Sequence, residues 1–328
     1  MIGGVGRART APDKQGQMLS DVSTPRPRGR HVTIADGRRM HAILQEPTTG
    51  TGEPNAPLVV LEAGAFGFSA DWASVQAELA GQGLRSLAYD RAGLGFSDPG
   101  PAPRDALAVD ADLYRLLDAI GEPGPYIYCG HSMAGLHARL FAARHGDRVT
   151  GVVLVDATTP ETIDDPGARR ALQSFTWLCR AVTAAANAGM VRPLAALGFG
   201  NAIGVQGAAD AEKRWAFADA AHNLWSTREV EVWAASAYQA MSAGLYPEAV
   251  PISAVFAGAP RRRRPRGPRV IRDHAPCPFA RVQHEPGANH ASLLGPRHAA
   301  NLARSVVQLS ESRRPRAEAP ALDTDSTT

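Results

Sequence analysis

One serine lies in the sequence setting that a catalytic nucleophile requires. Ser132 belongs to Tyr126-Ile-Tyr-Cys-Gly-His-Ser-Met-Ala-Gly135, in which an apolar run leads directly into Gly-His-Ser and a helical pattern follows. A serine on a tight strand-to-helix turn, called a nucleophile elbow, exposes its hydroxyl for attack on a carbonyl carbon. Ala134 replaces the second glycine of the usual Gly-x-Ser-x-Gly pattern. The alternative interpretation is that Ser132 only caps the helix.

The sequence indicates neither a metal site nor a cofactor site. Cys129, Cys179 and Cys277 show no Cys-x-x-Cys or Cys/His ligand spacing, which argues against a disulfide framework and a zinc site. Gly93 and Gly95 do not complete a phosphate-binding glycine pattern. The N-terminal residues lack the apolar run of a signal peptide, so we expect reduced thiols and a cytoplasmic location.

The elements that would position Ser132 form an alternating pattern of strands and helices. Short all-apolar strands separated by helices are typical of a parallel sheet that is covered on both faces. We expect strands at 31–34, 40–44, 58–61, 86–89, 126–129, 149–155, 252–256 and 280–282, and helices at 71–80, 106–120, 132–145 and 297–309.

The alternation stops after Ala157 and resumes at Ile252. The intervening segment is rich in Ala, Leu and aromatic residues at helical spacing, which indicates an inserted helical module. Four tryptophans lie in it, and the spacing of the last three fits one helical face. We expect this face to pack on the body; the alternative is that some of these rings line the pocket, which would favour an apolar group on the substrate. They are Trp177, Trp215, Trp225 and Trp233.

The composition divides the chain into five parts. Both ends are rich in Pro, Arg, Ser, Thr and Asp without hydrophobic periodicity, which is typical of disordered tails. We therefore expect tails at 1–29 and 312–328, a core in two parts at 30–158 and 251–311, and the helical insertion at 159–250. The most apolar stretch, 181–205, is interrupted by Arg192 and Asn201, so no membrane span is expected.

The positive charge of the chain is concentrated in one segment. The net charge is +3, and all but two of the 35 cationic residues are arginine, the exceptions being Lys14 and Lys213. Seven arginines lie within Arg261–Arg272, and the rest of the chain carries −4. Pro and Gly interrupt this run and no aromatic residue accompanies it, so we expect a flexible surface loop rather than a nucleic-acid site. A disturbed reading frame is the further alternative.

These segments together resemble the α/β-hydrolase fold family over roughly residues 30–310. The resemblance is carried by Val59-Val-Leu-Glu-Ala-Gly64, Tyr89-Asp-Arg-Ala-Gly-Leu-Gly-Phe-Ser97, Gly130-His-Ser132, Val152-Val-Leu-Val-Asp156 and Gly287-Ala-Asn-His290, in that order. It implies a mostly parallel eight-stranded sheet with helices on both faces and a helical lid inserted after the sixth strand.

The resemblance also implies a catalytic base and acid. His290 lies between the expected last strand and last helix, where this fold supplies the base. Most members supply the acid after the seventh strand, where the first carboxylate here is Asp273. Some supply it from the end of the sixth strand, where Asp156 stands, although an aspartate there could also serve a turn. We favour Asp156 over Asp273. His131, His137, His284 and His298 are weaker candidates for the base.

By the same resemblance, the backbone amides of Ala65 and Met133 form the oxyanion hole. The usual His-Gly of the loop before Ala65 is Ala63-Gly64 here.

From these residues together, we expect a cofactor-independent serine hydrolase that cleaves an ester-like bond of a small, apolar substrate through an acyl-enzyme. A serine rather than an aspartate nucleophile argues against epoxide-hydrolase and dehalogenase chemistry. The alternative is a non-catalytic hydrolase-like protein that binds a small ligand. The sequence does not indicate the oligomeric state.

Overall fold

The computed structural model describes residues 23–49, 56–259 and 281–311. These residues form one eight-stranded sheet in the order β1-β2-β4-β3-β5-β6-β7-β8. The pairs β1/β2 and β2/β4 are antiparallel, and all other pairs are parallel. The strands are β1 (Arg30–Thr33), β2 (Arg39–Gln45), β3 (Leu58–Glu62), β4 (Ser86–Tyr89), β5 (Tyr126–His131), β6 (Val149–Val155), β7 (Ile252–Ala257) and β8 (Arg281–Glu285).

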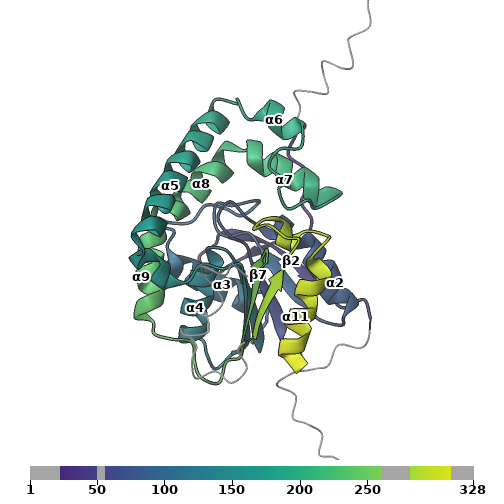
Figure 1. Cartoon of the computed structure of the whole chain (residues 1–328). Coiled ribbons are helices and arrows are strands. Elements are labelled where there is room, and N and C mark those ends of the chain that lie inside the picture. Colours follow the sequence, from purple (N-terminus) through teal and green to yellow (C-terminus); the bar gives the residue numbers. More distant parts are fainter. Residues whose placement is uncertain (1–22, 50–55, 260–280, 312–328) are drawn as a thin grey trace, which may run out of the picture.

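Helices cover both faces of the sheet because its central strands are apolar on both sides. In β3, Val59 and Leu61 pack into the cluster that contains α11 residues, whereas Leu58 and Val60 pack on the opposite face with residues of α3 and α4. Figure 1 shows α2 and α11 on one side and α3 and α4 on the other. These helices are α2 (Ala73–Gly81), α3 (Ala106–Ala119), α4 (Ala134–Arg144) and α11 (Ala299–Glu311). The predicted fold class is confirmed.

A helical lid follows β6 and lies over one end of the sheet, as predicted (Figure 1). It consists of a 3₁₀ turn η2 (Pro160–Asp164) and the helices α5 (Pro166–Asn187), α6 (Arg192–Ala196), α7 (Ala208–Ala218), α8 (Ala220–Glu231) and α9 (Trp233–Ser242). The expectation that three tryptophans share one helical face is wrong, because Trp215, Trp225 and Trp233 belong to α7, α8 and α9. The helix predicted at 71–80 begins as a separate 3₁₀ turn, η1 (Ser69–Trp72).

A buried ion pair between Arg91 and Glu229 connects the lid with the core. Arg91, in the loop after β4, donates to Glu229 of α8 through both Nε and Nη2, with Nη2 2.8 Å from Oε2. Both side chains are almost inaccessible to solvent. A planar guanidinium suits this two-point contact with a carboxylate better than an ammonium group does. Arg91 therefore fixes the position of α8 over the sheet.

A second buried carboxylate of the lid, that of Glu212, binds Arg28 in the predicted N-terminal tail. Arg28 donates to the buried carboxylate of Glu212 in α7 through its backbone amide at 2.8 Å and through Nε at 3.0 Å. The tail predicted at 1–29 therefore extends too far, because a charged pair at Arg28 holds the chain against the lid.

Residues 1–22 and 312–328, the segment Arg261–Arg272 and Asp273 lie outside the described residues. Within the described ranges, no helix combines the length and hydropathy that a membrane crossing requires.

The buried pair predicts a large loss of stability on substitution. Arg91→Met leaves the Glu229 carboxylate buried without its partner, so the free energy of unfolding should fall by about 3–5 kcal/mol. Arg180→Met is the matched control, because the Arg180–Glu231 pair is exposed on the lid surface and should contribute no more than about 1 kcal/mol. Urea denaturation measures both. Equal losses in the two variants would contradict the role of Arg91.

Candidate functional site

Ser132 stands on the turn between β5 and α4 with a strained backbone. Its φ is +56°, a conformation that residues with a side chain rarely adopt. Two hydrogen bonds hold the turn: the Ser132 amide donates to the Val155 carbonyl at 3.1 Å, and the Thr158 amide donates to the Ser132 carbonyl at 2.8 Å. The N-cap of α4 is Met133, with no side-chain cap bond. The interpretation of Ser132 as a helix cap is therefore wrong.

Small residues allow the turn to approach its neighbours. A Cβ atom on Gly64 would lie 2.7 Å from the Ser132 Cβ, and one on Gly135 would lie 2.5 Å from the Thr158 carbonyl oxygen. The position that must be glycine after the serine is thus Gly135. Ala134 is fully buried and its methyl group fits. The departure from the Gly-x-Ser-x-Gly pattern is consistent with elbow geometry.

The structure brings Ser132, His290 and Asp156 together in a hydrogen-bonded relay. His290 Nε2 lies 3.0 Å from Ser132 Oγ, and His290 Nδ1 lies 2.7 Å from Asp156 Oδ2. A carboxylate that accepts from Nδ1–H leaves Nε2 as the acceptor for the hydroxyl proton. Asp156 follows β6 with a φ of +42° and a side chain that is 3% exposed. Asp273, the alternative acid, lies outside the described residues.

A second histidine supports His290. His131 is buried, and its Nε2–H donates to the His290 carbonyl at 3.0 Å. Burial, together with the neighbouring His290, lowers the pKa of His131 to about 3. The two ring centroids are 4.6 Å apart. Because His131 stays neutral at physiological pH, it adds no repulsive charge when the His290 ring takes up a proton.

The loop after β3 offers backbone donors next to Ser132. The Gly67 amide donates to the Gly64 carbonyl at 3.1 Å and closes a turn in which Phe66 has a φ of +59°. Across the part of the chain that the structure describes, neither the Ala65 amide nor the Met133 amide donates to another protein group. These two predicted oxyanion donors are therefore available to a ligand.

The Arg91 guanidinium also binds the loop after β3. Its Nη1 donates to the Ala63 carbonyl, and its Nη2 donates to the Gly64 carbonyl at 2.9 Å. Glu62, which precedes them, is buried and accepts hydrogen bonds from Tyr89, Tyr128 and His137. Arg91 thus links the Gly64 turn to α8 of the lid.

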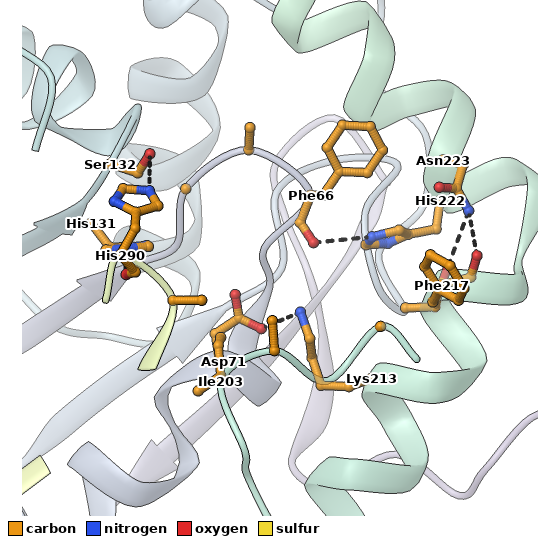
Figure 2. Close-up of a pocket in the computed structure, with 16 residues that line it drawn as sticks. Phe66, Asp71, His131, Ser132, Ile203, Lys213, Phe217, His222, Asn223 and His290 are labelled. Carbon is orange, nitrogen blue, oxygen red and sulfur yellow. Dashed lines mark hydrogen bonds and ion pairs between the residues drawn. The ribbon is translucent and has the colours of Figure 1, made fainter. Parts of the chain in front are cut away.

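A cavity of about 190 Å³ opens in front of Ser132 between the core and the lid. Figure 2 shows Ser132 and His290 on one side of it and Asp71 and Lys213 on another. Among the described residues, no tryptophan lines this cavity, which argues against the alternative that the lid tryptophans form the pocket wall. The walls are formed by Gly64, Ala65, Phe66, Asp71, His131, Ser132, Gly200, Ala202, Ile203, Lys213, Ala216, Phe217, His222, Asn223, His290 and Ala291.

The cavity contains charged and polar residues that sequence reasoning missed. Lys213 Nζ lies 2.6 Å from Asp71 Oδ1, and both side chains are less than one-tenth exposed. The Gly95 amide donates to His222 Nδ1 at 3.0 Å, and burial lowers the pKa of His222 to about 3. One signal was present in the sequence, because Lys213 is one of only two lysines in an arginine-rich chain.

The described residues contain no group of three or more His, Cys, Asp or Glu side chains that could hold a metal ion.

The histidines that were weaker candidates for the catalytic base have other partners. His137 binds Glu62, and His298 Nδ1 lies 3.4 Å from Glu285. The His284 ring lies near the Phe256 ring, with centroids 5.5 Å apart and an interplanar angle of 32°.

Part of the chain is similar to a known protein family and to several curated proteins. The family model described as alpha/beta hydrolase fold matches residues 57–196. An AB hydrolase superfamily protein from Gibberella zeae is 34% identical over 136 residues, which cover 40% of this chain and 41% of that protein. The chain spans less than half the length of each of eight curated relatives that it matches.

Two solved structures show the same fold. The enol-lactonase from Burkholderia xenovorans has a TM-score of 0.57 and 20% identity, with 85% of this chain and 99% of that chain covered. A putative epoxide hydrolase from Pseudomonas aeruginosa has a TM-score of 0.66 and 18% identity, with 89% and 98% covered. At this level of identity, the likeness concerns the fold.

The two buried neutral histidines predict a pH-dependent stability. The unfolded chain binds a proton at each histidine near pH 6.5, whereas His131 and His222 in the native state stay neutral until about pH 3. Stability is therefore lost as the pH falls below 6.5. Each histidine should lower the free energy of unfolding by about 2 kcal/mol between pH 7 and pH 5.

Urea denaturation at both pH values tests this expectation. In His222→Gln the loss between pH 7 and pH 5 should be smaller by about 2 kcal/mol than in the unmodified protein. His31→Gln is the control, since His31 is solvent-exposed and its replacement should preserve the original pH dependence. An unchanged loss in His222→Gln would show that His222 is not held neutral.

Proposed function

Because the chain belongs to the α/β-hydrolase fold family, we propose that it is a serine hydrolase that cleaves an ester-like bond through an acyl-enzyme. The ester-like bond is that of a carboxylic ester, a lactone or an amide. The observation that carries the proposal is the relay of Asp156, His290 and Ser132, with distances of 2.7 Å and 3.0 Å. A serine hydroxyl, an imidazole and a buried carboxylate in this order are the parts of nucleophilic acyl transfer.

In the first step, Ser132 Oγ attacks the carbonyl carbon of the substrate while His290 Nε2 removes the hydroxyl proton. The carbonyl oxygen becomes an oxyanion, which the amides of Ala65 and Met133 stabilise. Asp156 holds the imidazole in the required tautomer and stabilises its positive charge. The C–O or C–N bond of the substrate then breaks, and His290 gives the proton to the leaving group.

In the second step, water cleaves the acyl-enzyme. His290 Nε2 takes a proton from the water molecule, whose oxygen attacks the acyl carbon, and the same two amides stabilise the second oxyanion. The bond to Ser132 Oγ breaks, and the proton returns to this oxygen. The cycle requires neither a metal nor a redox cofactor. The cavity of about 190 Å³ favours a small acyl or alcohol group.

Covalent labelling tests the role of Ser132. A fluorophosphonate probe should modify the folded protein at Ser132, because phosphonylation needs the same activated hydroxyl and the same oxyanion donors. Ser132→Ala should abolish labelling, whereas Ser242→Ala, a change on the exposed end of α9, should not affect it. Mass spectrometry of the intact protein measures both. If a known serine hydrolase labels alongside and this protein does not, the chain is instead a non-catalytic ligand-binding protein.

The choice of acid has a separate test. Asp156→Asn should slow acylation by about 10³- to 10⁴-fold, because an amide in place of the carboxylate favours the wrong imidazole tautomer. Asp273→Asn is the paired variant and should retain nearly full activity. Stopped-flow labelling or ester hydrolysis gives the acylation rates. A large loss confined to Asp273→Asn would reverse the assignment.

A further inference from the structure

The wall of the cavity in front of Ser132 contains a buried ion pair that the acyl-transfer chemistry does not use. Lys213 comes from α7 of the lid and Asp71 from η1 of the core, and Nζ lies 2.6 Å from Oδ1. Both residues line the cavity that Ser132 and His290 also line. In Figure 2, Asp71 and Lys213 lie apart from Ser132 and His290. Because all four residues line one cavity, one bound molecule can contact both pairs.

The cation of this pair is a lysine, and a lysine suits ligand binding better than an arginine would. Almost every other cation in this chain is arginine, and buried pairs elsewhere in the fold, such as Arg91 with Glu229, use it. A guanidinium would engage the Asp71 carboxylate at two points, whereas an ammonium group has three N–H donors and needs only one for this contact. Lysine therefore leaves donors for a ligand. The Phe68 ring, 5.1 Å from Nζ, shields another side of the ammonium group.

The charge balance of the cavity selects the kind of group that fits. The Asp71 and Lys213 charges cancel. Of the three histidine rings on the wall, His290 belongs to the relay, and His131 and His222 are neutral at physiological pH because burial lowers the pKa of each to about 3. An added carboxylate would approach Asp71 and bring an uncompensated charge into a buried site. A purely apolar group would desolvate the ion pair without replacing its contacts. A hydroxyl group can accept from Lys213 and donate to Asp71.

We propose that Lys213 and Asp71 form a specificity subsite that binds a hydroxyl group of the substrate on a part of the cavity wall apart from Ser132. This inference rests on the proposed hydrolase function, since the subsite orients the ester that Ser132 attacks. It adds one hydroxyl group to the small, apolar substrate expected from the sequence. Neither residue touches the reacting atoms, so both act on substrate selection.

A matched ester series tests the subsite. Ethyl esters of unbranched acids that end in a methyl, hydroxyl or carboxylate group, each in several chain lengths, differ only in the group offered to the pair. A second series carries the same groups on the alcohol side. In at least one chain length, kcat/KM should be about 10- to 100-fold higher for the hydroxyl ester than for the methyl ester, as expected for a hydrogen bond to a charged group. The carboxylate ester should be the poorest substrate.

Two variants give opposite changes in preference. Lys213→Met should remove the advantage of the hydroxyl ester. Asp71→Asn leaves a net positive cavity, so the carboxylate ester should gain at least about 10-fold relative to the hydroxyl ester. Arg180→Met, on the exposed lid surface, should retain the original preference. If Asp71→Asn does not fold, the double variant Lys213→Met with Asp71→Leu removes both charges and should prefer the methyl ester.

Binding to an inactive protein separates this inference from the catalytic one. Calorimetry with Ser132→Ala and the intact esters measures the preference without any turnover. If the methyl and hydroxyl esters bind equally at every chain length, the subsite is refuted, even when the unmodified protein labels at Ser132. If Ser132 does not label but the hydroxyl ester still binds more tightly, the subsite is supported and the hydrolase proposal fails.

Discussion

The arrangement of the site depends on one buried cation. Arg91 places its guanidinium between the lid and the loop after β3, where it binds Glu229 on one side and the carbonyls of Ala63 and Gly64 on the other. Removing a guanidinium from water is costly, and only a full set of acceptors offsets this cost. The lid and the turn that carries the Ala65 amide are therefore fixed by the same side chain. The cavity exists because these two parts have a defined separation.

Charges rather than apolar contacts alone position the lid. Arg28 with Glu212, Arg91 with Glu229, and Lys213 with Asp71 each join a lid helix to the core or to the segment before β1. Ion pairs of this kind specify one geometry, because a shifted lid would leave buried charges without partners. A small cavity needs such precision, since a displacement of one ångström would change which atoms a substrate can reach.

Local features were predictable from the sequence, and long-range pairs were not. The elbow at Ser132 and the parallel sheet follow from short apolar runs and their turns, which are encoded within a few residues. The choice between Asp156 and Asp273 stayed open at that point, because an acid is defined by its distance from His290 and not by its neighbours in the chain. Lys213 and Asp71 were missed for the same reason, as no local pattern links α7 to η1. Arg28 was assigned to a tail because its partner, Glu212, belongs to the lid.

The close approach of Gly64 to Ser132 divides the molecule into parts with different freedom to change during evolution. Any side chain at position 64 would collide with the nucleophile, so this turn and the elbow are closed to most substitutions. Phe217, Lys213 and Asn223 instead stand on lid helices that carry no part of the relay. New substrates can therefore be acquired by exchanging lid residues while the inherited chemistry of the core remains intact.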